Sequence, residues 1–219
     1  MTHLALIFPG QGSQKIGMGK DLAENFPIAR AVFEEVDEAL SQKLSHLMWE
    51  GEQSELTLTT NAQPALMACS VAAFRVAREE AGLSLEHAVG LAGHSLGEYS
   101  AHACAGSFDL TTAAKLLRTR GDAMQSAMPV GEGAMAAILG MALDEVETIA
   151  THAGAEIAND NCPGQVVISG TVAAVDTACE VAKERGAKRA LKLDVSAAFH
   201  SQGMMPAQET MAEALAEAR

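Results

Sequence analysis

The order of apolar and polar residues predicts two buried strands in the first half of the chain. Residues 4–8 (LALIF) form a short continuous apolar run that ends at Pro9, and residues 88–94 (AVGLAGH) form a second run. Short apolar runs without alternation are typical of strands that are buried on both faces of a parallel sheet. We therefore expect both segments to be strands of such a sheet.

A helix is predicted between these two strands. Across residues 61–82 the apolar side chains recur at steps of three and four residues. Asn61 is a capping residue type, Pro64 stands near the expected first turn, and Gly82 stands at the expected end. Because strands then alternate with a helix, the sequence favours an α/β fold.

The pattern changes after residues 128–133 (MPVGEG). The segments that follow read as strand, helix, strand, strand, helix and strand, at residues 134–139, 143–154, 155–160, 165–170, 172–186 and 189–195. This βαββαβ order is that of a ferredoxin-like module. We expect such a subdomain at residues 130–195, inserted into a main α/β domain formed by residues 1–129 and 196–219.

The composition is that of a well-packed globular protein. Apolar residues make up 48% of the 219 positions, and the mean hydropathy is +0.10. A membrane span needs about 18 apolar residues in a row, and no run comes near that length, so we expect no membrane association. The N-terminal run has no basic leader or cleavage site, so no signal peptide is expected. A formal net charge of −13 argues against a nucleic-acid partner.

The cysteines and histidines predict neither a disulfide framework nor a metal site. The cysteines are far apart and form no CxxC pair: Cys69, Cys104, Cys162 and Cys179. Each has apolar or small neighbours, so we expect buried free thiols and a reducing compartment, the cytoplasm. The seven histidines show no ligand spacing such as HExxH. We therefore expect no bound metal or other cofactor.

Residues 93–97 (GHSLG) match the G-x-S-x-G pattern directly after a predicted strand. A serine held in a sharp turn between a strand and a helix needs small neighbours, because the flanking backbones pass close by. Ser95 would then be an exposed nucleophile, and the N–H of Leu96 would point at a developing oxyanion. A turn of small residues that merely contains a serine is the alternative interpretation.

A nucleophilic serine needs a base, and His200 in the segment VSAAFHS is the candidate. It follows the last predicted strand of the subdomain, where the chain returns to the main domain. The order of serine first and histidine later agrees with α/β-type serine enzymes, although an ordinary loop histidine would fit the spacing too. His94 is too close to Ser95 to serve easily as its base, so we expect it to support the turn.

Arg120 lies on the apolar face of a predicted helix at residues 111–128. The other members of that face are Ala113, Leu116, Leu117, Met124 and Met128. Burying a guanidinium costs free energy unless an anion pairs with it. The planar shape of the guanidinium suits a carboxylate, which can accept two hydrogen bonds from it. That carboxylate could be Glu98, near the serine turn, or it could belong to a substrate. The neighbouring Arg118 falls off this face.

The segment FPGQGSQ, residues 8–14, forms a glycine-containing loop after the first predicted strand. It is not a phosphate loop, because Asp21 follows Gly19-Lys20 and no glycine stands five positions before Gly19. It is not a G-x-G-x-x-G motif either, because Lys15 stands in the place of the third glycine. Loops at the carboxyl ends of parallel strands are where α/β proteins build their sites. Gln11 could therefore supply a backbone N–H to the site; a simple turn is the alternative.

Five segments, taken in order, resemble one family: FPGQGSQ, GHSLGE, RTRGDAM, NDNCPGQVVISG and VSAAFHS. The chain is similar over its whole length to the malonyl-CoA:acyl carrier protein transacylases of bacterial fatty-acid synthesis and to the acyltransferase domains of polyketide synthases. The resemblance implies an α/β-hydrolase-like core with an inserted ferredoxin-like subdomain. It also implies transfer of malonyl from malonyl-CoA to acyl carrier protein in two half-reactions.

The resemblance also implies roles for individual residues. Ser95 matches the nucleophile, His200 its base, and Arg120 the arginine that holds the malonyl carboxylate. The backbone N–H groups of Gln11 and Leu96 match the oxyanion hole. Motif residues with an expected supporting role in substrate binding are His94, Asn161 and Gln165. A basic run in an otherwise acidic chain suggests where an acidic carrier protein docks, or else a solvated helix end: Lys188, Arg189 and Lys192.

Members of this family continue beyond position 219, and their later segment completes the sheet and orients the base. The chain ends at AEALAEAR, in what reads as the middle of a helix, so we expect it to be a fragment. We expect a monomer. Two other functions remain open from the residues alone: a serine thioesterase or esterase with the same turn, and an inactive carrier-binding fragment.

Overall fold

The computed structural model describes residues 4–129, 131–195 and 197–218. The chain divides into two compact units. Unit 1 comprises the residues up to Asp122 together with those from Met211 onward, and unit 2 comprises Ala123–Thr210. In the described ranges, no helix combines the length and the apolar character that a membrane crossing requires.

Unit 1 pairs β1 (Leu4–Phe8) with β2 (Ala88–Gly93) in parallel. Both segments are the strands that the sequence predicts, but their predicted burial on both faces is wrong. The side chains of Ile7 and Val89 are 80% and 67% exposed. Successive side chains of a strand point to opposite faces. The buried Phe8 faces the core, whereas Ile7 faces away from it.

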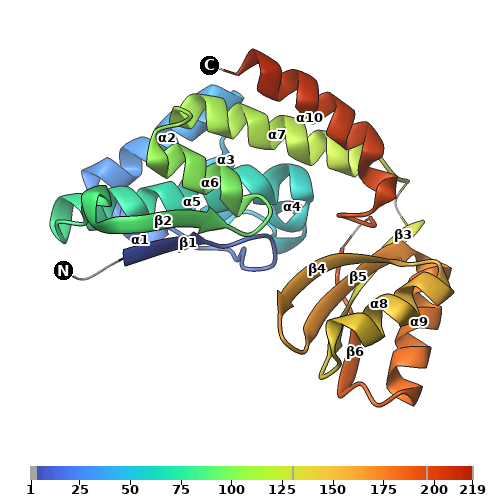
Figure 1. Ribbon diagram of the computed structural model, residues 1–219. Helices are drawn as coiled ribbons and strands as arrows, with labels where there is room; N and C mark the ends of the chain where they lie inside the picture. The colour runs from blue at the N-terminus through green and yellow to red at the C-terminus, as the bar shows by residue number, and fades with distance from the viewer. Residues whose placement is uncertain (1–3, 130, 196, 219) are drawn as a thin grey trace. The chain divides into compact units, whose positions relative to one another are not determined.

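Apart from the residues from Met211 onward, the rest of the described part of unit 1 consists of helices and the loops that join them, and α6 (Gly97–Ala105) packs on both strands (Figure 1). In chain order the helices are α1 (Lys20–Asn25), α2 (Pro27–Leu40), α3 (Leu44–Glu50), α4 (Gln53–Thr57), α5 (Thr59–Glu80), the 3₁₀ turn η1 (Leu85–His87), α6 and α7 (Leu110–Ser126), which crosses into unit 2. The core lies between α2, α5 and α6, where Val32, Phe33 and Met67 are fully or almost fully buried.

The predicted helix at 61–82 is confirmed as α5, but its predicted start is wrong. The helix begins at Thr59, and Leu58 rather than Asn61 is its N-cap residue. The side chain of Asn61 makes tertiary contacts instead: its Nδ2 donates to the carbonyl of Glu55 at 3.0 Å, and its Oδ1 accepts from Arg118 at 3.1 Å. Through these two contacts Asn61 binds α5 to α4 and α7. The N-cap of α5 has no side-chain hydrogen bond.

Unit 2 has the predicted order of strands and helices. They are β3 (Gly133–Leu139), α8 (Leu143–Ala153), β4 (Glu156–Cys162), β5 (Gln165–Thr171), α9 (Val172–Glu184) and β6 (Arg189–Lys192). All pairings in the sheet are antiparallel, in the spatial order β4-β5-β3-β6. The first strand begins at Gly133, one residue before its predicted start at 134. The last strand ends at Lys192 rather than at the predicted residue 195.

Both faces of this sheet are covered within unit 2. Helices α8 and α9 cover one face, where Ile138 and Ile168 are buried (Figure 1). On the other face, Met124 from α7 packs with Phe199 and Met204 against Met135. The unit therefore also includes the end of α7, the 3₁₀ turn η2 (Gln202–Met204) and the start of α10 (Met205–Glu217). The predicted domain boundaries at 129/130 and 195/196 stay predictions.

The prediction that the cysteines are buried free thiols is confirmed only in part. All four described cysteines are free, and Cys104 and Cys179 are buried. Cys69 is half-buried, and Cys162 is exposed at the end of β4, so the predicted burial of Cys162 is wrong. The strand ends in a hairpin at this position, which leaves its last side chains in solvent.

Candidate active site

Ser95 lies at the bend between β2 and α6, as the sequence predicts. The strand ends at Gly93, and the helix begins at Gly97 with Leu96 as its N-cap residue. Ser95 has a φ of 53°, a left-handed conformation that costs a non-glycine residue about 1–2 kcal/mol. The bend is held by backbone hydrogen bonds, among them His94 N–H to the Phe8 carbonyl at 3.1 Å. The serine is therefore held in a strained conformation at a helix N-terminus.

The two glycines that flank this bend are required by close backbone contacts. A Cβ on Gly93 would lie 1.9 Å from the carbonyl carbon of Gly97. A Cβ on Gly97 would lie 2.4 Å from the carbonyl oxygen of Phe8. The steric reason that the sequence suggested for G-x-S-x-G is thus confirmed: strand, helix and the loop after β1 pass too close together for any larger residue.

Arg120 reaches Ser95 from α7. Its Nη2 donates to Ser95 Oγ at 3.0 Å, and its Nη1 donates to Gln63 Oε1 at 2.6 Å. The guanidinium carbon also lies 5.9 Å from the centre of the Tyr99 ring. The sequence placed Arg120 on an apolar face, and the structure adds that this face brings it to the serine.

The internal carboxylate that the sequence left open for Arg120 is not its partner. Within the described ranges, no carboxylate oxygen lies within 4 Å of the guanidinium, and the Glu98 side chain is exposed. Burial lowers the pKa of Arg120 from its ordinary value, while the charges of Tyr99 and Glu98 act in the opposite direction. An arginine stays protonated in proteins. The site therefore holds a half-buried cation that neutral groups contact, next to a serine hydroxyl.

Close contact between α7 and α5 positions Arg120. A Cβ on Gly121 would lie 2.6 Å from the Cα of Thr60, so the helices approach each other at this glycine. On one side, Arg118 Nη1 donates to Thr60 Oγ1 at 2.9 Å. On the other side, Thr60 Oγ1 donates to Asp122. These contacts are made two positions before and two positions after Arg120 in the chain, so they limit its movement.

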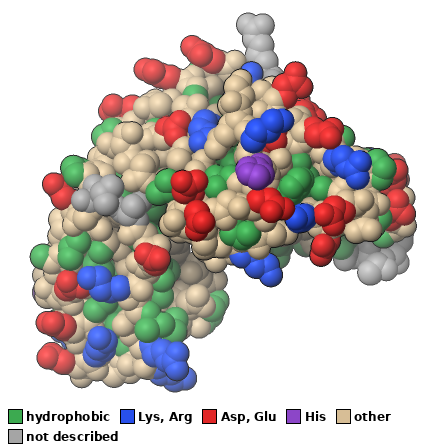
Figure 2. Space-filling view, turned by 180° about the vertical axis from the view of Figure 1, so that it is seen from behind, with side chains coloured by type: hydrophobic (Ala, Val, Ile, Leu, Met, Phe, Trp, Pro, Cys, Tyr) green, Lys and Arg blue, Asp and Glu red, His purple; other side chains and the backbone are tan. Residues whose placement is uncertain are grey.

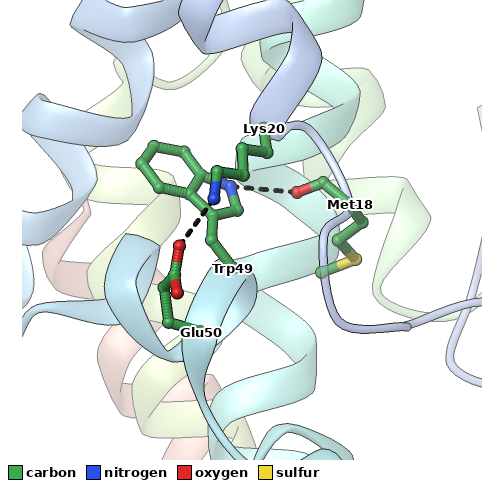
Figure 3. Close-up of polar contacts among 4 residues, drawn as sticks. All are labelled: Met18, Lys20, Trp49 and Glu50. Carbon is green, nitrogen blue, oxygen red and sulfur yellow. Dashed lines mark hydrogen bonds and ion pairs between the residues drawn. The ribbon is translucent and has the colours of Figure 1, made fainter.

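Gln11 lies in the loop between β1 and α1, beside the N-terminal end of α5. Its side-chain Oε1 accepts a hydrogen bond of 3.0 Å from Thr59 Oγ1. The same loop is anchored farther along, as Figure 3 shows: Trp49 Nε1 donates to the Met18 carbonyl at 3.2 Å, and Lys20 pairs with Glu50 at 2.6 Å. The loop is thus attached to helices at both of its ends.

His94 is exposed, and its ring lies against the same loop. A Cβ on Gly10 would lie 2.5 Å from His94 Nδ1, so the loop backbone and the ring are in close contact. This contact agrees with the expected supporting role of His94, because it joins the serine bend to the segment that carries Gln11.

The other predicted site residues lie in unit 2. His200 is exposed and has a φ of 57°, again a left-handed conformation. Its turn is attached to β4, since Gln202 N–H donates to both carboxylate oxygens of Glu156 at 3.1 and 3.2 Å. Asn161 and Gln165 are exposed on the β4–β5 hairpin.

The predicted basic residues lie on and beside β6. Figure 2 shows Lys and Arg side chains gathered at one end of unit 2, with acidic side chains close by. Lys188 and Arg189 are exposed. Lys192 pairs with Asp176 at 2.7 Å, so part of its charge is already compensated. Of the three residues, Lys188 and Arg189 remain the stronger candidates for contact with an anionic partner.

Sequence reasoning missed two residues of the site, Thr59 and Gln63. Both side chains are 1% exposed, and Gln63 Nε2 donates to Thr59 Oγ1 at 2.9 Å. They stand four positions apart in the first turns of α5, so they share one face. That spacing is a signal that could have found them.

Comparison with known proteins identifies the type of domain. The family model of the acyl transferase domain matches residues 5–219. The malonyl CoA-acyl carrier protein transacylase of Bacillus subtilis (strain 168) is 52% identical, over 98% of this chain and 68% of that protein. A crystal structure of acyl-carrier-protein-S-malonyltransferase from Bartonella henselae is 56% identical, with a TM-score of 0.95 over 100% of this chain and 71% of the other.

A solved complex contains a similar chain together with a carrier protein. It is described as a type II polyketide synthase acyl-carrier protein in complex with its malonyl-transacylase. The similar chain is 41% identical, with a TM-score of 0.95 over 100% of this chain and 71% of that one. The likeness therefore extends over both units of the chain.

Proposed function

The chain belongs to the acyl transferase domain family, and we propose that it moves a malonyl group from malonyl-CoA to the phosphopantetheine thiol of acyl carrier protein. The observation that carries this proposal is the hydrogen bond of 3.0 Å between Arg120 Nη2 and Ser95 Oγ. It places a cation suited to a carboxylate beside a strained serine hydroxyl. The relatives named as malonyl transacylases support the same function.

In the first half-reaction Ser95 Oγ attacks the thioester carbon of malonyl-CoA, and His200 takes the serine proton. The backbone N–H groups of Leu96 and Gln11 stabilise the oxyanion. The carbon–sulfur bond then breaks, the proton passes to the thiolate of CoA, and malonyl-Ser95 remains. In the second half-reaction the carrier thiol attacks malonyl-Ser95, and the same steps run in reverse.

Arg120 selects the acyl group in this mechanism. A malonyl carboxylate gives the guanidinium an anionic partner, whereas an acetyl group leaves it with neutral contacts only. A general esterase or thioesterase has no use for a cation at this position. The guanidinium therefore favours the malonyl group over uncharged acyl groups.

We further propose the finer assignments that the resemblance implies. The main domain is α/β-hydrolase-like, and the β3–β6 sheet with its helices is the ferredoxin-like subdomain. Asn161 and Gln165 have supporting roles in substrate binding, and Lys188 and Arg189 contact the acidic carrier protein. A cytoplasmic location and a monomeric state stay predictions of the sequence.

The test of the function is the mass of the intact protein after incubation with malonyl-CoA. We expect a gain of one malonyl group in the parent chain and none in Ser95→Ala, with loss of the adduct when phosphopantetheinylated carrier protein is added. Rapid release of free malonate without transfer would assign a hydrolase. An unchanged mass in the parent, with no release of free malonate, would assign a binding function without catalysis.

Replacing Arg120 tests the basis of selectivity. We expect Arg120→Ala to lower malonyl transfer about a hundredfold or more, because removing one partner of a buried ion pair costs about 3–5 kcal/mol. Acetyl transfer should rise relative to malonyl transfer. Arg120→Lys keeps the charge without the planar fork and should give an intermediate loss. An unchanged ratio of malonyl to acetyl use in Arg120→Ala would remove Arg120 from this role.

A further inference from the structure

A continuous line of hydrogen bonds joins Arg120 to Gln11. Arg120 Nη1 donates to Gln63 Oε1 at 2.6 Å, Gln63 Nε2 donates to Thr59 Oγ1 at 2.9 Å, and Thr59 Oγ1 donates to Gln11 Oε1 at 3.0 Å. Thr59 and Gln63 are 1% exposed, so bulk water does not reach the middle of this line. We refer to these four side chains as the relay.

The hydrogen bonds of the relay all run in one direction, from Arg120 toward Gln11. A guanidinium has donors only, so the oxygen of the Gln63 amide must face it. The NH₂ of Gln63 then faces Thr59, and the threonine oxygen must accept. The single proton of that hydroxyl is donated to the Gln11 amide oxygen at 3.0 Å. The orientation of the Gln11 amide is thus linked to Arg120 through three successive hydrogen bonds.

We propose that Thr59 is a positioning residue that couples the acyl-selecting Arg120 to the loop that carries Gln11. The coupling deepens the proposed function and rests on it for its catalytic meaning. In that function one end of the relay binds the acyl carboxylate, and the other end belongs to the loop whose backbone N–H helps to hold the oxyanion. Thr59 touches neither group of the substrate and acts through its two neighbours.

Threonine suits this position because its hydroxyl can accept and donate at once. Valine has nearly the same shape but lacks the hydroxyl, so Thr59→Val removes both the hydrogen bond from Gln63 Nε2 and the one to Gln11 Oε1. Serine keeps the hydroxyl, so Thr59→Ser keeps the relay. This pair of variants separates the hydrogen bonds from the packing of the side chain.

The first experiment needs no activity. Side-chain amide resonances of Gln11 are followed by NMR in ¹⁵N-labelled chain. We expect Arg120→Ala to shift them in the parent and to leave them unchanged in a Thr59→Val background, because the relay is already broken there. Arg118→Ala is the matched control, since Arg118 lies on the same helix but bonds to Thr60, Asn61 and Gln42. The proposal would be overturned if Arg120→Ala left the Gln11 chemical shifts unchanged in the parent, or changed them equally in the parent and in the Thr59→Val background.

The second experiment measures malonyl and acetyl transfer separately. We expect Thr59→Val to lower the rate of malonyl-serine formation about tenfold, as expected when buried polar groups lose a partner. Acetyl transfer should fall less, and Thr59→Ser should restore both rates to near the parent values. An equal loss with both acyl groups, or no rescue by serine, would overturn the coupling. Failure of the parent to form any malonyl adduct would instead overturn the proposed function, while the NMR result would still decide the relay.

Discussion

The turns that carry Ser95 and His200 hold the same backbone conformation by different means. Both residues have a left-handed φ, 53° and 57°. The Ser95 turn is held by backbone approaching backbone, with glycines at Gly93 and Gly97. The His200 turn follows the deeply buried Phe199, and the side chain of Ser201 closes it by donating to the Ala198 carbonyl at 2.7 Å.

The difference shows two ways of holding a strained residue in place. In unit 1 the small size of the neighbours allows the conformation, so added bulk should destroy it. In unit 2 a buried aromatic side chain anchors the segment before His200, so lost bulk should loosen it. Each turn is thus sensitive to the opposite kind of substitution.

The largest effect is expected for Gly93→Ala. The new Cβ would lie 1.9 Å from a backbone carbonyl carbon, which no rotation of a side chain can relieve. We expect unit 1 to be destabilised by about 4 kcal/mol or more. Urea unfolding followed by fluorescence of Trp49, the one tryptophan of the chain, measures this.

Gly90→Ala is the matched control for Gly93→Ala, on the same strand. Within the part of the chain that the structure describes, a Cβ on Gly90 would meet no heavy atom within 4 Å. We expect a change within about 1 kcal/mol for this variant. Equal effects of the two substitutions would contradict the steric account of the Ser95 turn.

A smaller but still large effect is expected for Phe199→Ala. Phe199 is 5% exposed and packs with Met124, Met135 and Met204. Removing such a side chain leaves a cavity and costs about 3–5 kcal/mol. Hydrogen exchange of the β3 and β5 amides in unit 2 measures the loss. Leucine fills most of the same space, so Phe199→Leu should lower the free energy of unfolding by less than about 1.5 kcal/mol. A similar loss in both variants would show that Phe199 does not anchor the turn by filling space.

The smallest effect compares glycine with alanine at the two strained positions. At Ser95 and at His200 the glycine variant should be more stable than the alanine variant by about 1 kcal/mol, because only glycine adopts a left-handed φ without steric cost. At Thr177, within α9, the order should reverse by a similar amount. Thermal unfolding of the six variants measures these differences. Alanine variants as stable as glycine at 95 and 200 would mean that neither conformation is strained.

Local features of this protein could be predicted from its sequence. The strands predicted at 4–8 and 88–94 are β1 and β2, the latter ending one residue earlier, at Gly93. The βαββαβ order of unit 2 followed from periodicity and turn residues. The bend at Ser95 followed from the glycines around it, and the position of Arg120 on an apolar face followed from helical spacing. These features depend on residues within a few positions of one another, where backbone geometry and side-chain period act directly.

Only the tertiary structure decided which distant residues meet. Nothing in the local pattern says that Gln63 rather than Glu98 contacts Arg120, or that Thr59 bonds to Gln11 across 48 positions. It also decided that Ile7 faces away from the core and that Asn61 bonds to Glu55 and Arg118 instead of capping a helix. The physical reason is that burial and hydrogen-bond partners depend on how helices and strands pack, and Gly121 allows α7 to approach α5 closely enough for this site to form.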